Sequence, residues 1–226
     1  LQAADGAVRA IFYLLGGRRA RNVCEAWRAG LARHGVQMTA RAAEERRGIE
    51  AEVSIHYGLW GSLRTLHAEA AAANARAVFC DLGYWERTRP DKLNGHHRIA
   101  VNALHATAYF QLVRHAPERF RRLGIKTARF RRGGGHVLLC GMSAKAAWVY
   151  GLGPEEWERR AAAALTAATA REVRYRPKPS WREASPIAGT TWRGDRGMTR
   201  APIEAALAGA WALATHHGNA ALDALA

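Results

Sequence analysis

Cysteine is scarce in this chain of 226 residues, with only three cysteines in total. Cys24, Cys80 and Cys140 lie far apart in apolar surroundings, and the sequence contains no CxxC motif. This pattern excludes the disulfide framework that holds small secreted domains together. We therefore expect reduced, buried thiols in a cytoplasmic protein.

Long apolar runs are also missing. No stretch approaches the ~18 apolar residues that a helix needs to cross a bilayer, so we expect no contact with a membrane. The first residues, Leu1 to Gly6, lack a basic region and a cleavage-like site, which predicts no signal peptide. Apolar residues make up 49% of the chain and charged residues 23%, as in an ordinary globular protein of one large or two small domains.

Acidic residues are few compared with basic ones. The chain has 19 Asp and Glu against 34 Lys and Arg, which gives a formal net charge of +15. Such a charge attracts polyanions and nucleotide phosphates. All but four of the basic residues are arginine. Alanine is also abundant, so part of the excess of arginine is compatible with a GC-rich genome. The charge therefore permits contact with nucleic acid but does not require it.

In the first half, apolar runs alternate with stretches of helical spacing. Apolar residues at 23, 26, 27 and 31 follow the spacing of one helix face, after Asn22 as a cap and before Gly35 as an end. The order strand, loop, helix, strand is typical of a parallel α/β sheet. The predicted strands are Val8 to Leu15, Val36 to Ala40, Glu52 to Tyr57 and Ala77 to Leu82, and the predicted helices are Val23 to His34 and Leu63 to Ala75.

The middle of the chain is polar. Glu86 to Asn94, with Pro90, is predicted as a loop, and Asn102 to Arg114 as a helix. Residues 116–135 are predicted as a basic connection between two units, because they combine seven basic residues with a closing run of three glycines, Gly133 to Gly135. These basic residues are Arg119, Arg121, Arg122, Lys126, Arg129, Arg131 and Arg132.

The alternation of predicted strands and helices begins again after this connection. Pro154 is predicted to open a helix with Trp157, Ala161 and Leu165 on its inner face. The predicted strands are His136 to Cys140, Glu172 to Tyr175 and Ala210 to Thr215, with a short helix from Ala201 to Leu207. The sequence thus predicts an α/β fold with two units in tandem, residues 1–115 and 136–226.

Polar residues follow each predicted strand of the second unit. Ser143 and Lys145 come after one strand, Arg176 and Lys178 after another, and the backbone of Gly218 to Ala220 after the third. Ligands bind at the carboxyl ends of strands in open parallel sheets, and cationic side chains hold phosphates there. We therefore predict a diphosphate site; the alternative for "RPKPSWR" is a solvated basic loop whose prolines end a strand.

The adjacent His216 and His217 raise the question of a metal. Neighbouring residues on a strand point to opposite faces, and no further ligand is near in sequence, so we expect no metal there. The same argument applies to His96 and His97, so we expect no metal there either. A histidine that donates to a phosphate or a ribose fits better, and Asn219 is a candidate helix cap.

In the first unit, Asp81 is the main candidate for catalysis. A carboxylate at the end of an apolar strand is partly desolvated, which raises its pKa toward that of a general base. His56 is the second candidate. The alternatives are an Asp81 that caps the turn at Gly83 and a His56 that belongs to the core. The neighbouring aromatic residues either stack on a sugar or base or serve in packing; they are Tyr57, Trp60, Tyr84 and Trp85.

Several stretches, taken in order, resemble the GT-B glycosyltransferases, and in particular the glycosyltransferase-like proteins of tailed bacteriophages. These stretches are "DLGYWERT", "GHHRIAVNALHATAYF", "GMSAKA", "YRPKPSWR" and "THHGNAALDAL". The resemblance as a whole covers most of the chain. The last resembles the family's nucleotide-diphosphate loop, with Asp223 as the acidic residue of the following helix. The resemblance implies two Rossmann-like parallel-sheet lobes, a second lobe shorter than usual, and an infected bacterial cell as the location.

The resemblance also implies a function. A nucleotide-sugar donor is expected on the second lobe, held without a metal or other cofactor. The residues expected to hold it are Ser143, Lys145, Arg176, Lys178, His216, His217, Gly218 and Asn219. Some phage proteins of this fold glycosylate hydroxymethylated pyrimidines in DNA, and the basic connection suits a DNA acceptor whose base is flipped from the stack. The alternatives are a polysaccharide glycosyltransferase and a non-catalytic DNA-binding module on the same scaffold. The oligomeric state is not indicated.

Overall fold

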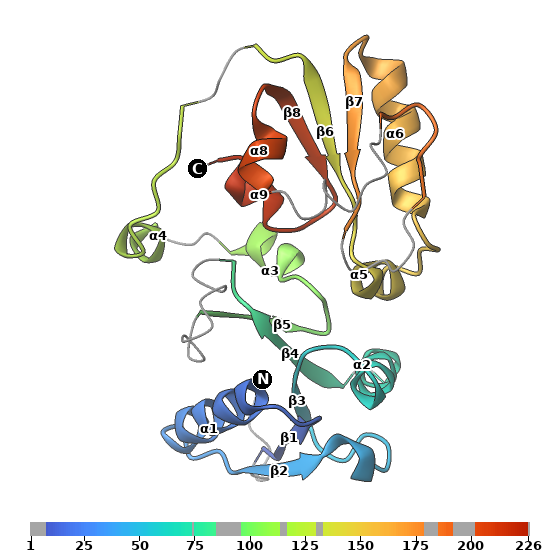
Figure 1. Cartoon of the computed structure of the whole chain (residues 1–226). Coiled ribbons are helices and arrows are strands. Elements are labelled where there is room, and N and C mark those ends of the chain that lie inside the picture. Colours follow the sequence, from blue (N-terminus) through green and yellow to red (C-terminus); the bar gives the residue numbers. More distant parts are fainter. Residues whose placement is uncertain are drawn as a thin grey trace. The chain divides into compact units, whose positions relative to one another are not determined.

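The computed structural model describes residues 8–73, 75–84, 96–113, 117–129, 133–178, 185–191 and 202–225 (Figure 1). The chain divides into two compact units, Leu1–His115 and Ala116–Ala226. Each unit has its own β-sheet, and together they make an α/β protein with a mixed five-stranded sheet and a separate three-stranded parallel sheet. No helix in the described part of the chain is long and apolar enough to cross a membrane.

Unit 1 is built on a sheet with the strand order β2-β1-β3-β4-β5. The first four strands are parallel to one another. The strands are β1 (Ala10–Leu14), β2 (Met38–Ala42), β3 (Val53–Tyr57), β4 (Arg76–Leu82) and β5 (His97–Val101). The helices are α1 (Arg18–Ala32), α2 (Ser62–Ala72) and α3 (Thr107–Leu112), with a short 3-10 helix, η1 (Ala43–Glu45).

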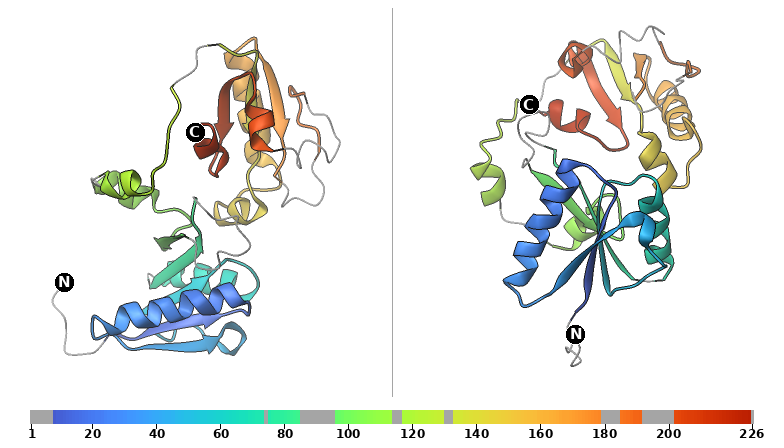
Figure 2. Two further views of the ribbon diagram at one scale, coloured as in Figure 1. Left: turned by 60° about the vertical axis from the view of Figure 1, so that its left-hand side comes forward. Right: turned by 60° about the horizontal axis from the view of Figure 1, so that its bottom comes forward.

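Both faces of the sheet in unit 1 are covered by helices (Figure 2). Phe12 of β1 packs in one cluster with Val23 and Cys24 of α1, and its neighbour Tyr13 packs in another with Leu63 of α2. Side chains alternate between the faces of a strand, so a run that is apolar at every position is buried on both sides. This explains why apolar runs without alternation predicted the central strands.

Strand β5 differs from the prediction of parallel sheets. It pairs with β4 in the antiparallel direction, with Leu82 opposite His97 and Val78 opposite Val101. The sequence indicated no strand here, because an edge strand carries a mixture of polar and apolar residues. Ile99 and Val101 are about half exposed, and only Ala100 is buried. The sheet is therefore mixed, as is common when an antiparallel strand is added at the edge of a parallel sheet.

Unit 2 is built on a three-stranded parallel sheet with the order β7-β6-β8. The strands are β6 (His136–Cys140), β7 (Glu172–Arg176) and β8 (Ala210–Thr215). Every residue of β6 is buried, as the central position of this strand requires. The helices are α4 (Glu118–Arg122), α5 (Ala144–Val149), α6 (Glu156–Ala168), α8 (Ile203–Leu207) and α9 (Ala220–Asp223).

The core of unit 2 forms where α6 packs on β6 and β7. Leu139, Val173 and Tyr175 are buried there, and Trp157, Ala161 and Leu165 of α6 pack against them, as predicted for the inner face of this helix. The thiol of Cys140 lies at the end of β6. All three cysteines of the chain are buried and free, which confirms the expectation from their spacing.

Candidate functional site

The three strands of unit 2 end side by side. Cys140, the last residue of β6, lies opposite Arg176 of β7 and opposite Thr215 of β8. The backbone N–H of Gly141 donates to the carbonyl of Arg176 (2.9 Å), which fixes the start of the loop after β6 beside the end of β7. The loops predicted to bind a diphosphate therefore begin at one edge of one parallel sheet, where ligands of open α/β sheets bind.

Cationic groups gather around the end of β6. The charges of Arg176 and Lys178 both act to lower the pKa of the Cys140 thiol and that of Asp223 acts to raise it, so all three lie within electrostatic range of this thiol. Burial is the largest influence, and the pKa of Cys140 is raised to about 11. The side chain of Cys140 is consequently a neutral thiol. It lies at the edge of the sheet that also carries the cationic residues Arg176 and Lys178.

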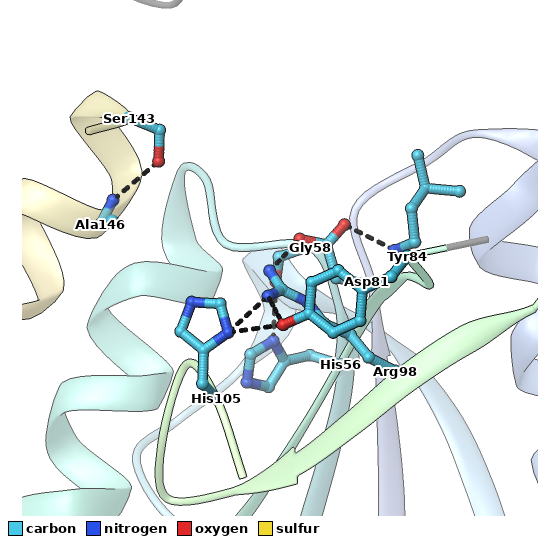
Figure 3. A network of polar contacts seen from close by, with 9 residues as sticks. His56, Gly58, Asp81, Tyr84, Arg98, His105, Ser143 and Ala146 are labelled. Atoms are coloured by element: carbon cyan, nitrogen blue, oxygen red, sulfur yellow. Dashed lines mark hydrogen bonds and ion pairs between the residues drawn. The ribbon is translucent and has the colours of Figure 1, made fainter. Parts of the chain in front are cut away.

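Ser143 has a structural role in the loop after β6. Its side-chain oxygen accepts a hydrogen bond from the N–H of Ala146 (3.2 Å) and so caps α5 (Figure 3). The sequence predicted only a loop here, because the six residues of α5 are too few to show a helical period. Lys145 lies in the first turn of α5. The hydroxyl hydrogen of Ser143 stays available to a ligand, because a hydroxyl can donate and accept together.

His216 and His217 follow the end of β8 and contact each other. Their Nδ1 atoms lie 2.8 Å apart, and the ring of Tyr150 lies 4.8 Å from that of His216. Strand β8 ends at Thr215, so the alternation of a strand does not separate the two rings, which differs from the prediction. Among the residues that the structure describes, no group of three or more His, Cys, Asp or Glu side chains is arranged to hold a metal ion.

The turn after these histidines leads into α9. Gly218 has φ 137°, in the region that favours glycine, and Asn219 precedes the helix with helical backbone angles. The side chain of Asn219 makes no capping hydrogen bond, so the expected capping role is wrong. The carbonyl of Asn219 instead accepts from Leu222 and Asp223, within the short helix.

In unit 1, Asp81 lies at the carboxyl end of β4 and forms an ion pair with Arg98 of β5. The Nη2 of Arg98 lies 3.0 Å from Oδ2, and both side chains are 18% exposed. The other oxygen, Oδ1, accepts from the N–H of Leu82 (2.8 Å). The guanidinium stabilises the charged carboxylate, which opposes the desolvation that the sequence suggested.

Arg98 extends this ion pair into a wider polar cluster (Figure 3). Its Nη1 lies 2.8 Å from Nδ1 of His105 and 3.4 Å from the hydroxyl of Tyr84. The hydroxyl of Tyr84 lies 2.9 Å from the same Nδ1 of His105. Sequence reasoning missed Arg98 because it missed β5, and it missed His105 because it expected a helix from Asn102, whereas α3 begins only at Thr107. Once β5 is placed beside β4, the antiparallel register puts Arg98 directly opposite Asp81.

His56 belongs to the core. Its side chain is completely buried, its Nδ1 lies 2.9 Å from the carbonyl of Gly58, and its Nε2 lies 3.3 Å from Nδ1 of His67. Burial lowers the pKa of His56 to about 4. These surroundings do not suit a base that must reach a substrate, so the alternative of a core histidine is the better interpretation.

The aromatic residues near Asp81 divide between packing and exposure. Tyr57 is buried and its ring lies 5.7 Å from that of His97. Trp60 is 44% exposed and Tyr84 is 36% exposed, so these two rings are accessible to a ligand. Trp85 lies outside the described residues.

The predicted basic connection is exposed where it is described. Arg121 and Arg122 end α4, Lys126 and Arg129 follow it, and all four are exposed. Arg119 belongs to α4, and Arg131 and Arg132 lie outside the described residues.

Comparisons with known proteins give no family for this chain. No model of a protein family matches it, and no curated protein is significantly similar to it.

Proposed function

We propose that the protein is a glycosyltransferase of the GT-B type that moves a sugar from a nucleotide-diphosphate donor to a hydroxyl group. The observation that carries this proposal is the register around Cys140. It brings the loop of Arg176 and Lys178 and the loop of His216 and His217 to the same edge of the sheet in unit 2. Parallel strands with cationic residues at their carboxyl ends suit a diphosphate.

The chemistry that this site supports is stabilisation of a leaving group. In the transfer, the bond between C1 of the sugar and the diphosphate oxygen breaks, and a bond from the acceptor oxygen to C1 forms. Negative charge then grows on the departing nucleotide diphosphate. Arg176 and Lys178 stabilise this charge by hydrogen bonding and electrostatics, which is the type of contribution that a metal makes in other enzymes.

The acceptor hydroxyl must lose its proton in the same reaction. We assign this proton to Asp81, which the ion pair with Arg98 keeps charged and oriented. Oδ1 accepts from the N–H of Leu82 and Oδ2 accepts from Arg98. A carboxylate oxygen can accept more than one hydrogen bond, so Asp81 can also accept from the hydroxyl of a substrate. Burial makes His56 unsuitable for this role.

The net charge of +15 and the exposed residues of the basic connection favour an acceptor in DNA. We infer that this acceptor is a hydroxymethylated pyrimidine, flipped out of the stack. Contacts with phosphates would supply most of the affinity and make it sensitive to salt.

The direct experiment offers the purified protein a panel of labelled nucleotide sugars together with hydroxymethylpyrimidine DNA. The proposal expects label in the DNA for one donor and none in unmodified DNA. Hydrolysis of a donor without transfer would favour a polysaccharide acceptor. Salt-sensitive binding of DNA with no binding of any donor would overturn the proposal in favour of a DNA-binding module.

A further inference from the structure

Two glutamates at the start of α6 are buried, although glutamate is rarely buried without a cationic partner. Glu155 is 7% exposed and Glu158 is 1% exposed. Within the described residues neither carboxylate forms an ion pair, whereas their partly buried neighbour Glu156 pairs with Arg160 along the helix. Burial raises the pKa of Glu158, and the nearby charge of Glu155 adds to this rise.

The partners of these two glutamates include residues at the ends of β6 and β7, where the loops of the candidate diphosphate site begin. Oε1 of Glu158 accepts from the backbone N–H of Met142 at 2.6 Å, two residues after the end of β6. Oε1 of Glu155 accepts from the hydroxyl of Tyr175 (3.3 Å), the residue before Arg176, and from the N–H of Ser185 (3.1 Å). The buried acids thus connect α6 to the ends of β6 and β7.

Gly141 shows how closely these parts fit. A Cβ atom at Gly141 would lie 3.0 Å from the backbone nitrogen of Lys178 and 3.2 Å from both Oε1 of Glu158 and the hydroxyl of Tyr175. Contacts of this length are tighter than side chains normally allow. The carboxylate of Glu158 therefore lies next to Gly141, at the point where the loop after β6 meets the backbone of Lys178.

We propose that Glu158 is a positioning residue of the diphosphate site: its carboxylate holds the Gly141–Met142 backbone against α6 and so sets the separation between that loop and Lys178. This inference rests on the proposed donor site. Glu158 contributes the acceptor oxygen and not its negative charge, because a negative charge beneath the site opposes the binding of an anion. The hydrogen bond that Glu158 accepts therefore favours binding of the nucleoside diphosphate, whereas the negative charge of Glu158 opposes it.

The opposite effects make the role testable with two substitutions of one residue. Glu158→Gln keeps an oxygen for the Met142 N–H and removes the charge, so the nucleoside diphosphate should bind as tightly as to the unaltered protein, or more tightly. Glu158→Leu removes the oxygen that accepts from the Met142 N–H and releases the loop, so affinity should fall about tenfold or more. Glu156→Leu is the matched control: it removes a partly buried carboxylate that accepts from the N–H of Gly153 (2.8 Å), away from Met142, and it should not change affinity.

The measurement is the dissociation constant of the nucleoside diphosphate by calorimetry, with the thermal unfolding midpoint of each variant recorded beside it. Rescue by Gln together with loss in Leu supports the role. Equal affinities of the Leu variant and the unaltered protein overturn it, as does an equal loss in Gln and Leu. If the unaltered protein binds no nucleoside diphosphate, the proposed function itself has failed.

A second variant decides the matter if Glu158→Leu does not fold. Gly141→Ala adds the crowded Cβ between Glu158 and Lys178 while keeping every hydrogen bond of the carboxylate. We expect this variant to fold, because Gly141 does not have a positive φ angle, and to bind the nucleoside diphosphate about tenfold more weakly. Unchanged affinity in folded Gly141→Ala would contradict the proposal.

Discussion

Arg176 lies directly opposite Cys140 in the parallel register of β7 and β6. Cys140 in turn lies opposite Thr215 of β8, so β6 carries the site at the centre of its sheet. The register therefore places Arg176, the cationic residue at the end of β7, beside the start of the loop that follows β6. Each unit has its own sheet and core, so the stability of each unit is predicted separately.

The buried histidines of unit 1 predict a loss of stability in mild acid. The pKa of His56 is lowered by burial from its ordinary value of 6.5 to about 4, and that of His67 is lowered for the same reason. The unfolded chain therefore takes up protons at a pH where the folded chain does not. The stability that follows is fully present above pH 6.5 and is lost as the pH falls from 6.5 to 4, by about 3 kcal/mol for His56.

Urea unfolding of unit 1 at several pH values between 7.5 and 5 measures this effect. In this range the carboxylates with lowered pKa values stay charged, so the histidines dominate the change. The His56→Gln variant should show a flatter dependence on pH, whereas His34→Gln, at an exposed histidine, should not. An equally steep dependence in His56→Gln would contradict the assignment.

Replacement of Asp81 by Asn should separate binding from chemistry. The amide keeps the shape of the carboxylate but cannot take a proton from the acceptor, so the rate of sugar transfer should fall by roughly 100-fold or more. Affinity for the donor should stay unchanged, because the proposed donor site lies in unit 2. Initial rates with labelled donor give the first quantity and calorimetry the second. Glu25→Gln on the surface of α1 serves as the control, and a normal rate in Asp81→Asn would remove Asp81 from the mechanism.

The basic connection predicts a specific dependence of DNA binding on salt. Alanine at the four exposed positions Arg121, Arg122, Lys126 and Arg129 should weaken binding and reduce the slope of log affinity against log salt by about 0.9 for every phosphate that the variant no longer neutralises. Fluorescence anisotropy with duplex DNA from 50 to 300 mM salt, about the range where such slopes are clear, measures it. The matched control removes the same charge from α1 through alanine at Arg18, Arg21, Arg28 and Arg33. A slope unchanged in the first variant, or equal losses of affinity in both, would locate the DNA site elsewhere.

The buried thiols predict low reactivity in the native protein. Burial raises the pKa of Cys80 to about 12 and that of Cys140 to about 11, and reagents attack the thiolate. An aromatic disulfide reagent at pH 8 should therefore modify Cys80 and Cys140 slowly in the native state and all three cysteines rapidly in denaturant. Fast modification of Cys140 in the native protein would show that the end of β6 is open to solvent.

The sequence predicted the strands whose burial is uniform. His136–Cys140 was predicted with the bounds that the structure gives, because its residues from Val137 to Cys140 are buried on both faces and are apolar at every position. The edge strand β5 was missed, since half of its side chains are exposed and its polar residues resemble a loop. The predicted helix from Asn102 is shorter in the structure, where Asn102 has φ 51° and its side chain accepts from the N–H of Ala77.

The candidate site was predictable only where it follows strand order. The loops of Arg176 and His216 were placed at one edge because parallel strands bring their ends together. The partners of these residues depend on contacts over long sequence distances, which periodicity does not reveal. Glu158 shows this, because glutamate in the first turn of a helix suggests an exposed residue favoured by the helix dipole, whereas the fold buries it beneath Met142.

The central claim is that the carboxyl edge of the sheet in unit 2 binds a nucleoside diphosphate, and calorimetric titration of a double variant tests it most directly. Arg176→Ala with Lys178→Ala should weaken binding by roughly 100-fold or more, because two charge-assisted hydrogen bonds are removed. Arg171→Ala with Arg174→Ala makes the same change of charge near the start of β7 and should bind normally. Unchanged affinity in the first double variant, with its fold intact, would contradict the account.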